Sequence, residues 1–156
     1  MDLNPPGYCG CLLLAKVFID ADVLFAGSAS PSEFVASLVV LRMAEITLIK
    51  AVTSQQVITE AERNLAQKMP ATLPAFQLLV QRCLVVVSDP KPADLSDLKG
   101  LADEKDLPIL GAALREKCNW LVTSNVLDYQ PGHPDIVILK PGAFLTEARY
   151  LLSQLR

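Results

Sequence analysis

The sequence contains one histidine, His133, and lacks the short glycine-rich motifs of nucleotide-binding enzymes. A serine–histidine triad needs a histidine beside an activated nucleophile, and no Gly-x-Ser-x-Gly motif occurs in the chain. His133 lies between Gly132 and Pro134, in a segment typical of a turn rather than of a catalytic base. The Walker and dinucleotide-binding glycine patterns are also missing. These absences exclude serine hydrolases and the common nucleotide-binding enzymes.

The chain also has no long apolar run and no zinc-type arrangement of cysteines. A membrane-spanning helix needs about 20 apolar residues in succession, and the runs here are far shorter. Asp2, with no basic residue ahead of the short apolar patch that follows, argues against a signal peptide. Cys9 and Cys11 form a Cys-x-Cys, but no second ligand pair follows at zinc-site spacing. We therefore expect a cytoplasmic protein with reduced thiols and no membrane association.

The composition fits one globular domain. The 156 residues suffice for a single core, and 51% of them are hydrophobic while only 6% are aromatic, which indicates an aliphatic interior rather than disorder. Pro5, Pro6 and Gly7 predict a loose leader over residues 1–15, followed by a single domain over 16–156. The formal net charge of −3 argues against general adhesion to nucleic acids.

Apolar, β-branched runs alternate with segments of helical periodicity along the chain. The predicted strands cover 17–19, 46–52, 84–87, 120–122 and 136–139, and Gly27-Ser28 predicts a turn after the first of them. The strand over 84–87 is expected to be short and buried. Helices are predicted from capping signals at 30–33 and 53–54, and over 73–83, 93–101, 106–117 and from 141 onward. Strands that alternate with helices indicate a mainly parallel sheet, so the expected fold is a three-layer α/β/α domain.

Two aspartates, Asp20 and Asp22, follow the first predicted strand directly. The carboxyl ends of strands are where open α/β sheets bind ligands. Two carboxylates one residue apart repel each other, and partial burial makes their ionisation more costly. A divalent metal ion commonly offsets this repulsion, whereas Asp at such a position is also a frequent turn or capping residue. On this segment alone, a metal site and a helix cap both remain open.

Three further acids lie at the ends of predicted elements. Glu60 adjoins the apolar stripe of the helix that begins near Ser54, Asp106 stands at a helix start, and Asp128 follows the strand over 120–122. These positions are compatible with one edge of the sheet, where clustered carboxylates would suit Mg²⁺ or Mn²⁺. Other acids are expected on exposed faces, namely Glu62, Glu116 and Glu147.

The chain resembles the PIN-domain ribonucleases, which include the VapC-like toxins of toxin–antitoxin modules. The matching segments are VFIDADVLFAG from Val17, VTSQQVITEAERNL from Val52, KDLPILGAAL from Lys105 and NWLVTSNVLDYQP from Asn119. Their order and spacing agree with the family over roughly residues 16–140. The last two segments are most similar to the PIN branch described as toxin components. The resemblance implies a PIN-like fold with a mainly parallel central sheet.

The resemblance also implies the catalytic residues. It places the three family acids on Asp20, Glu60 and Asp106, which would hold one or two Mg²⁺ or Mn²⁺ ions, and it aligns Thr123 with the polar residue before the last motif.

The chain departs from the family pattern at two positions. Family members commonly carry Asn where this chain has Asp22, and often Asp where it has Asn125. An amide oxygen can bind a metal ion but brings no charge, and Asp128 is the candidate to replace the lost charge.

The implied reaction is metal-assisted hydrolysis of an RNA phosphodiester bond, with the metal ion lowering the pKa of a bound water. The implied partners are an RNA substrate, a cognate antitoxin protein and, as in other family members, a second copy in a homodimer. Arg63 and Arg115 are candidates for phosphate contacts, although each also fits a solvated surface position.

Two other functions remain open at this level. An apolar strand that ends in Asp-x-Asp also opens the haloacid-dehalogenase-like phosphatases, which normally place Thr where this chain has Leu24. The second alternative is a degenerate PIN domain that binds RNA or a protein without catalysis, which the departure at Asn125 keeps open.

Overall fold

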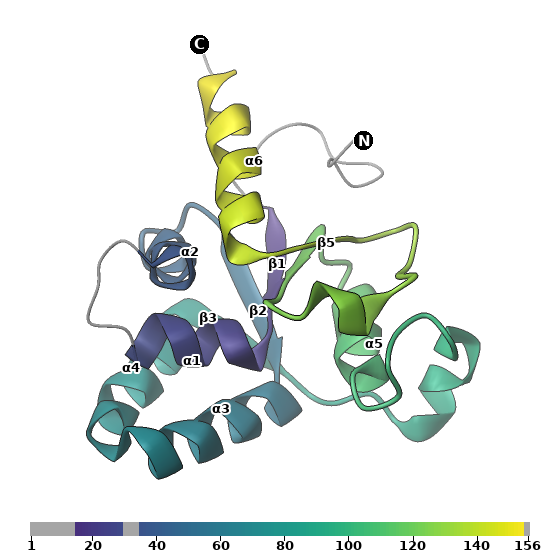
Figure 1. Cartoon of the computed structure of the whole chain (residues 1–156), viewed down its shortest axis with the longest axis horizontal. Coiled ribbons are helices and arrows are strands. Elements are labelled where there is room, and N and C mark those ends of the chain that lie inside the picture. Colours follow the sequence, from purple (N-terminus) through teal and green to yellow (C-terminus); the bar gives the residue numbers. More distant parts are fainter. Residues whose placement is uncertain (1–14, 30–34, 155–156) are drawn as a thin grey trace.

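The fold is a parallel five-stranded sheet covered by helices, as the computed structural model shows for residues 15–29 and 35–154 (Figure 1). The strand order is β3-β2-β1-β4-β5, and all four strand pairs are parallel. The strands are β1 Lys16–Ile19, β2 Lys50–Ser54, β3 Leu84–Val87, β4 Trp120–Val122 and β5 Val137–Leu139. The predicted parallel α/β architecture is confirmed.

Six α-helices and three 3₁₀ helices connect these strands in the described part of the chain. The α-helices are α1 Ala21–Ala29, α2 Ala36–Glu45, α3 Gln55–Lys68, α4 Leu73–Cys83, α5 Leu107–Arg115 and α6 Pro141–Ser153. The 3₁₀ helices are η1 Pro70–Thr72, η2 Pro92–Leu98 and η3 Val126–Tyr129. Because parallel crossovers are right-handed, the helices between β1 and β3 cover one face of the sheet and α5 covers the other.

Strand β1 lies at the centre of the sheet, between β2 and β4. Val17, Phe18 and Ile19 are fully buried, which explains the continuous apolar run at this position. The chain builds the sheet outward from β1 in one direction, through β2 and β3. It then returns to the other side of β1 and continues outward through β4 and β5. Such a reversal opens a crevice beyond the carboxyl ends of the strands. Asp20 is the first residue beyond β1 and therefore faces this crevice.

Several local predictions are confirmed. Ser54 caps α3 by accepting a hydrogen bond from the backbone N–H of Val57, and α4 covers 73–83 as expected. The apolar stripe of α3 is buried throughout, at Val57, Ile58, Ala61 and Leu65. The stripe fixes the rotation of α3, and with it the face that carries Glu60. The expected leader, apart from Ala15, and the helix start at 30–33 lie outside the described residues.

The turn predicted at Gly27-Ser28 is wrong, because both residues belong to α1. Gly27 is needed for close helix packing: a Cβ atom there would lie 2.6 Å from Leu41 Cδ1 and 3.0 Å from the carbonyl oxygen of Ser37. The second strand also starts later than predicted, at Lys50 instead of residue 46. Thr47 has a φ of 61°, a left-handed conformation that a strand cannot contain, so 46–49 form a turn.

Three further expectations need correction. Strand β3 is not buried, because it lies at the sheet edge with Val85 and Val86 exposed. The short helix predicted over 93–101 is the 3₁₀ helix η2, Pro92–Leu98. Glu147, expected on an exposed face, is buried on α6 with 9% of its surface accessible. Among the helices of residues 15–29 and 35–154, none is both long and apolar enough to cross a bilayer.

Candidate functional site

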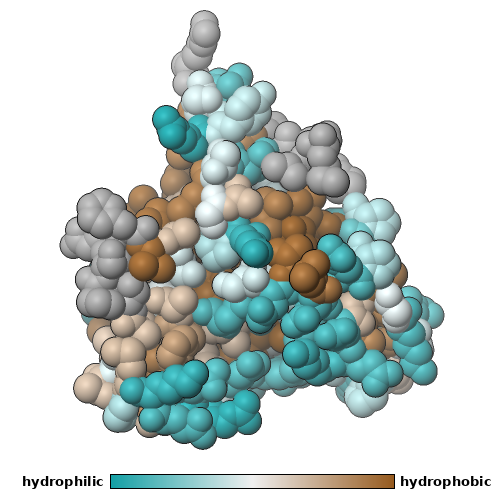
Figure 2. Space-filling view, in the orientation of Figure 1, coloured by the Kyte–Doolittle hydropathy of each residue, from teal (hydrophilic) through white to brown (hydrophobic). Residues whose placement is uncertain are grey.

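A cavity of about 230 Å³ lies beyond the carboxyl ends of β1 and β4, and five of its eleven lining residues are acids. Hydrophilic side chains also gather on the molecular face that Figure 2 shows, in the region between α1, α3 and η3. The cavity brings together residues that are far apart in the sequence. Its lining comprises Asp20, Ala21, Asp22, Gln56, Glu60, Arg63, Lys105, Asp106, Asn125, Asp128 and Tyr129.

Asp20 is the most buried carboxylate of this cavity, with 7% of its surface accessible. Its Oδ2 accepts hydrogen bonds from the hydroxyl of Thr123 over 2.9 Å and from the hydroxyl of Tyr129 over 2.8 Å. Its Oδ1 accepts one from the backbone N–H of Ala21 over 2.7 Å. These donors fix the carboxylate in one orientation at the end of β1. Burial is the first cause that raises the pKa of the Tyr129 hydroxyl, and the nearby negative charge of Asp20 is the second. The hydroxyl therefore stays protonated.

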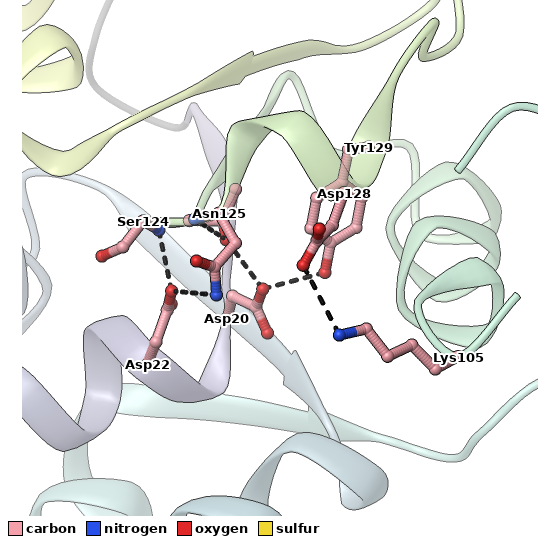
Figure 3. A network of polar contacts seen from close by, with 8 residues as sticks. Asp20, Asp22, Lys105, Ser124, Asn125, Asp128 and Tyr129 are labelled. Atoms are coloured by element: carbon pink, nitrogen blue, oxygen red, sulfur yellow. Dashed lines mark hydrogen bonds and ion pairs between the residues drawn. The ribbon is translucent and has the colours of Figure 1, made fainter. Parts of the chain in front are cut away.

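Asp22 lies in the first turn of α1, beside Asp20 (Figure 3). Its Oδ2 accepts hydrogen bonds from the backbone N–H of Ser124 over 2.9 Å and from Nδ2 of Asn125 over 3.2 Å. Its Oδ1 is buried, and no donor among the described residues reaches it. Burial, and then repulsion by Asp20, raise the pKa of Asp22 to about 6. Asp22 therefore keeps one oxygen atom available for a cation.

Asp106 occupies the N-cap position of α5, as predicted, but its side chain makes no capping hydrogen bond to the helix. Its Oδ2 is instead buried, without a hydrogen-bond partner in the described part of the chain. Burial, followed by repulsion from Asp20, raises the pKa of Asp106 to about 6. The position at the helix start thus serves to direct a carboxylate into the cavity, and the helix dipole favours the anion there.

Glu60, Gln56 and Arg63 reach the cavity from α3. Glu60 therefore lines the same cavity as Asp20 and Asp106, as the helical spacing predicted. Arg63 also lines a neighbouring hollow of about 410 Å³, together with Asp89. Its exposed guanidinium group is thus beside the acids rather than remote from them.

Asp128 lies on η3 and is half-buried. Its Oδ2 is 3.6 Å from Nζ of Lys105, and one oxygen each of Asp103, Asp106 and Asp128 lie within 4.8 Å of one another. Asp128 is therefore paired with a cation, whereas Asn125 directs its amide nitrogen to Asp22. Figure 3 shows the two arrangements next to each other.

Thr123 supports the site in two ways. Its hydroxyl donates to Asp20 and also accepts a hydrogen bond from the backbone N–H of Asn125 over 3.1 Å. It therefore joins the carboxyl end of β4 to that of β1 and holds the loop that carries Asn125.

Arg115 does not lie at this site. It donates a hydrogen bond to the carbonyl oxygen of Ser88, forms an ion pair with Glu116 over 3.5 Å and lines a separate cavity of about 670 Å³. His133 lines that separate cavity as well, in the loop after the cis peptide bond between Gln130 and Pro131. The structure thus brings together all the site residues predicted from the sequence except Arg115.

Sequence reasoning missed Tyr129, Lys105 and Asp103. All three lie within or beside segments that carry the family resemblance, but nothing in their local patterns indicates that they face the acids. Their placement depends on the backbone N–H of Asp103, which donates to the carbonyl oxygen of Asp128 over 2.7 Å and joins η3 to the loop before α5.

The chemistry of the cavity's oxygen donors suits a hard divalent cation, and among the described residues the acids with oxygens within 4.8 Å of one another are Asp103, Asp106 and Asp128. Asp22 and Asp106 each present a buried carboxylate oxygen that no described donor satisfies, and Asp20 and Glu60 line the same cavity. An uncompensated buried carboxylate is costly, and an oxygen-rich site is what Mg²⁺ and Mn²⁺ prefer. Burial first, and repulsion by Asp20 second, raise the pKa values of Asp22 and Asp106, which express the same cost.

Comparison with known proteins bears on the family and the fold. Residues 16–127 match the model of the PIN domain family, and no curated protein matches the chain. The fold is similar to that of a chain in the crystal structure of VapBC2 from Rickettsia felis bound to a DNA fragment from their promoter, with a TM-score of 0.58 and 13% identity. That alignment covers 79% of this chain and 96% of the other. The structure of PAE2754 from Pyrobaculum aerophilum has a TM-score of 0.58 and 15% identity, covering 96% of this chain and 99% of the other.

Proposed function

The chain belongs to the PIN domain family, and from this membership and the acid-lined cavity we propose that it is a metal-dependent endoribonuclease. The observation that carries the proposal is the pair of buried, unsatisfied carboxylate oxygens on Asp22 and Asp106, counted over the described residues. A structural role alone does not account for two such atoms in one cavity, since buried polar atoms are nearly always satisfied.

In this proposal Asp20, Asp22, Glu60 and Asp106 hold Mg²⁺ or Mn²⁺. The bound ion would supply a water of lowered pKa and would offset the negative charge that develops on the phosphate. Asp128 and Asn125, the two other candidate ligands, remain beside this set, where Asp128 pairs with Lys105 and Asn125 donates to Asp22.

The remaining residues orient the acids. Thr123 and Tyr129 hold Asp20 from the side of β4 and η3, and the backbone N–H of Ser124 holds Asp22. Because these donors belong to the fold, the carboxylates need little rearrangement when an ion and RNA bind. Hydrolysis by water requires no protein nucleophile, which agrees with a cavity lining that contains no serine, cysteine or histidine among the described residues.

We extend the proposal to the biological context: the toxin component of a toxin–antitoxin pair, with a cognate antitoxin protein as partner and a homodimer as the assembly. The support is the resemblance of the motifs and the similarity of the fold to a chain of VapBC2. The match to the PIN domain family sets aside the haloacid-dehalogenase-like alternative.

The test is cleavage of single-stranded RNA by the full chain with Mn²⁺, with Mg²⁺ and with EDTA, alongside release of phosphate from a phosphate monoester. We expect internal RNA cleavage that requires the metal ion, and no monoester hydrolysis. Asp20→Asn should abolish cleavage and leave the fold intact, while Asp97→Asn, an exposed acid that does not line this cavity, should cleave like the wild type. RNA binding without cleavage at any metal concentration would instead support a non-catalytic PIN domain.

A further inference from the structure

Lys105 is a cation at the mouth of the acid-lined cavity. It belongs to the loop before α5, and 72% of its side chain is exposed. Its Nζ lies 3.6 Å from Oδ2 of Asp128, and Figure 3 shows the side chain reaching from the loop toward η3. An exposed ion pair of this length contributes little to folding stability. The position of Lys105 therefore needs an explanation other than stability.

Two contacts hold Lys105 beside the cavity. The backbone N–H of Asp103 donates to the carbonyl oxygen of Asp128, so the loop that carries Lys105 is fixed to η3 at its base. The carboxylate of Asp128 then attracts the ammonium group from the same side. A lysine ammonium group is charged at neutral pH. The ammonium group is thus both held and accessible.

The charge around the cavity poses a problem for an RNA substrate. Acidic side chains from the end of β1, from α1 and α3, from the start of α5 and from η3 face the space that a phosphodiester would enter. A metal ion offsets part of this charge, but the phosphates on either side of the scissile bond still meet a negative surface. Among the lining residues, Lys105 and Arg63 carry positive charge, and they come from different elements, the loop before α5 and α3.

We propose that Lys105 binds a phosphate group of the RNA strand at the mouth of the cavity, with Asp128 keeping the ammonium group in place until RNA displaces it. The inference rests on the proposed function, because it assigns a substrate contact to the same site. A flexible lysine with three donors suits this contact, since it reaches a phosphate as a point charge and reads no base.

The experiment measures RNA binding by the full chain in Ca²⁺. Fluorescence anisotropy reports the affinity for single-stranded oligonucleotides of several sequences at several salt concentrations. We expect Lys105→Met to weaken binding by about tenfold for every sequence, the size of one lost charged contact. The slope of log affinity against log salt should fall by about 0.7, which corresponds to one phosphate contact on a single strand.

Two variants serve as controls. Lys105→Arg keeps the charge and should retain most of the affinity. Lys99→Met removes an exposed lysine that does not line the cavity and should bind RNA like the wild type. Thermal melting of each variant checks that the fold is unchanged.

The outcomes separate this inference from the proposed function. Unchanged RNA affinity in Lys105→Met would overturn the inference about Lys105. If a calorimetric titration of this variant also showed tighter Mn²⁺ binding, Lys105 would be only a counter-ion of the acids. Wild-type protein that does not bind RNA would overturn it too. Protein that binds RNA through Lys105 but does not cleave it in Mn²⁺ would contradict only the proposed function.

Discussion

The hydroxyl of Tyr129 donates a hydrogen bond to Oδ2 of Asp20 over 2.8 Å and so joins η3 to the carboxyl end of β1. Both residues are buried, at 2% and 7% exposure. We expect Tyr129→Phe to lower the free energy of unfolding by about 1.5–3 kcal/mol, the usual contribution of a hydrogen bond to a charged group. Chemical denaturation measures this loss. Cleavage should also fall, because Asp20 then keeps only Thr123 as a side-chain donor among the residues that the structure describes.

Tyr150→Phe is the matched control for this change, since Tyr150 is 58% exposed on α6. It should alter neither stability nor cleavage. Equal stability of Tyr129→Phe and wild type would mean that the hydrogen bond to Asp20 contributes nothing measurable to the fold.

The raised pKa values of Asp22 and Asp106 predict an unusual pH dependence for the metal-free protein. Both values are about 6 in the folded chain against an ordinary 3.8, so the folded state binds protons more readily than the unfolded state. The contribution of these two groups to stability therefore increases as the pH falls from about 7 through 6 toward 4. It is lost again as the pH rises through 6.

Asp22→Asn isolates this effect, because the amide resembles the protonated acid. At pH 7.5 without metal we expect it to melt about 2–4 °C above wild type, roughly 1 kcal/mol for a chain of this size after allowance for solvent screening. The difference should shrink at pH 5. Saturating Mn²⁺ should reverse the order at pH 7.5, because wild type gains more binding energy. Melting curves that keep the same difference at both pH values would contradict the raised pKa of Asp22.

Asp106→Ala tests whether the acid at the start of α5 is a cap or a cavity residue. Loss of a true N-cap costs roughly 0.5–2 kcal/mol, and we expect that loss for Ser54→Ala, whose side chain does cap α3. Asp106 makes no such bond within the described structure and is repelled by Asp20, so Asp106→Ala should stabilise the metal-free protein. The same variant should lose Mn²⁺ binding. Denaturation without metal that shows equal losses for both variants would identify Asp106 as a cap.

Features with a local cause could be predicted from the sequence. The apolar run of β1 predicted that Asp20 lies at the strand end, and the capping residue Ser54 predicted the start of α3. The apolar stripe of α3 fixes the rotation of the helix, which directs Glu60 to the cavity. Each depends on residues within a few positions of one another. Each of these predictions therefore agreed with the structure.

Features that depend on packing between distant segments could not be predicted. From the sequence alone, Gly27 is typical of a turn. Its role in close packing against Leu41 and the backbone of Ser37 is visible only in the folded structure. The pairing of Lys105 with Asp128 spans two segments that are distant in the sequence and are joined by backbone hydrogen bonds, from Asp103 to Asp128 and from Gly132 to Leu101. No periodicity or capping pattern encodes such a contact, and the same holds for the burial of Glu147 against its neighbours.

Asn125 is a position at which the chain departs from the family pattern. Its Nδ2 donates to Oδ2 of Asp22, so Asn125→Asp removes a donor and places a second carboxylate beside the first. Without metal we expect a lower melting temperature and a further raised pKa of Asp22. With Mn²⁺ we expect tighter binding than in wild type, because an added anionic ligand increases affinity for hard cations.

Calorimetric Mn²⁺ titration and melting with and without Mn²⁺ measure both effects, and Asp128→Asn completes the comparison. Because Asp128 already has Lys105 as a partner, its loss should weaken Mn²⁺ binding less than Asp22→Asn does. If Asp128→Asn instead lost as much affinity as Asp22→Asn, Asp128 would be the residue that supplies the charge missing at position 125. Asn125→Asp would then add a sixth acid to the five that already line the cavity, and the gap between its metal-bound and metal-free melting temperatures would not exceed that of the wild type.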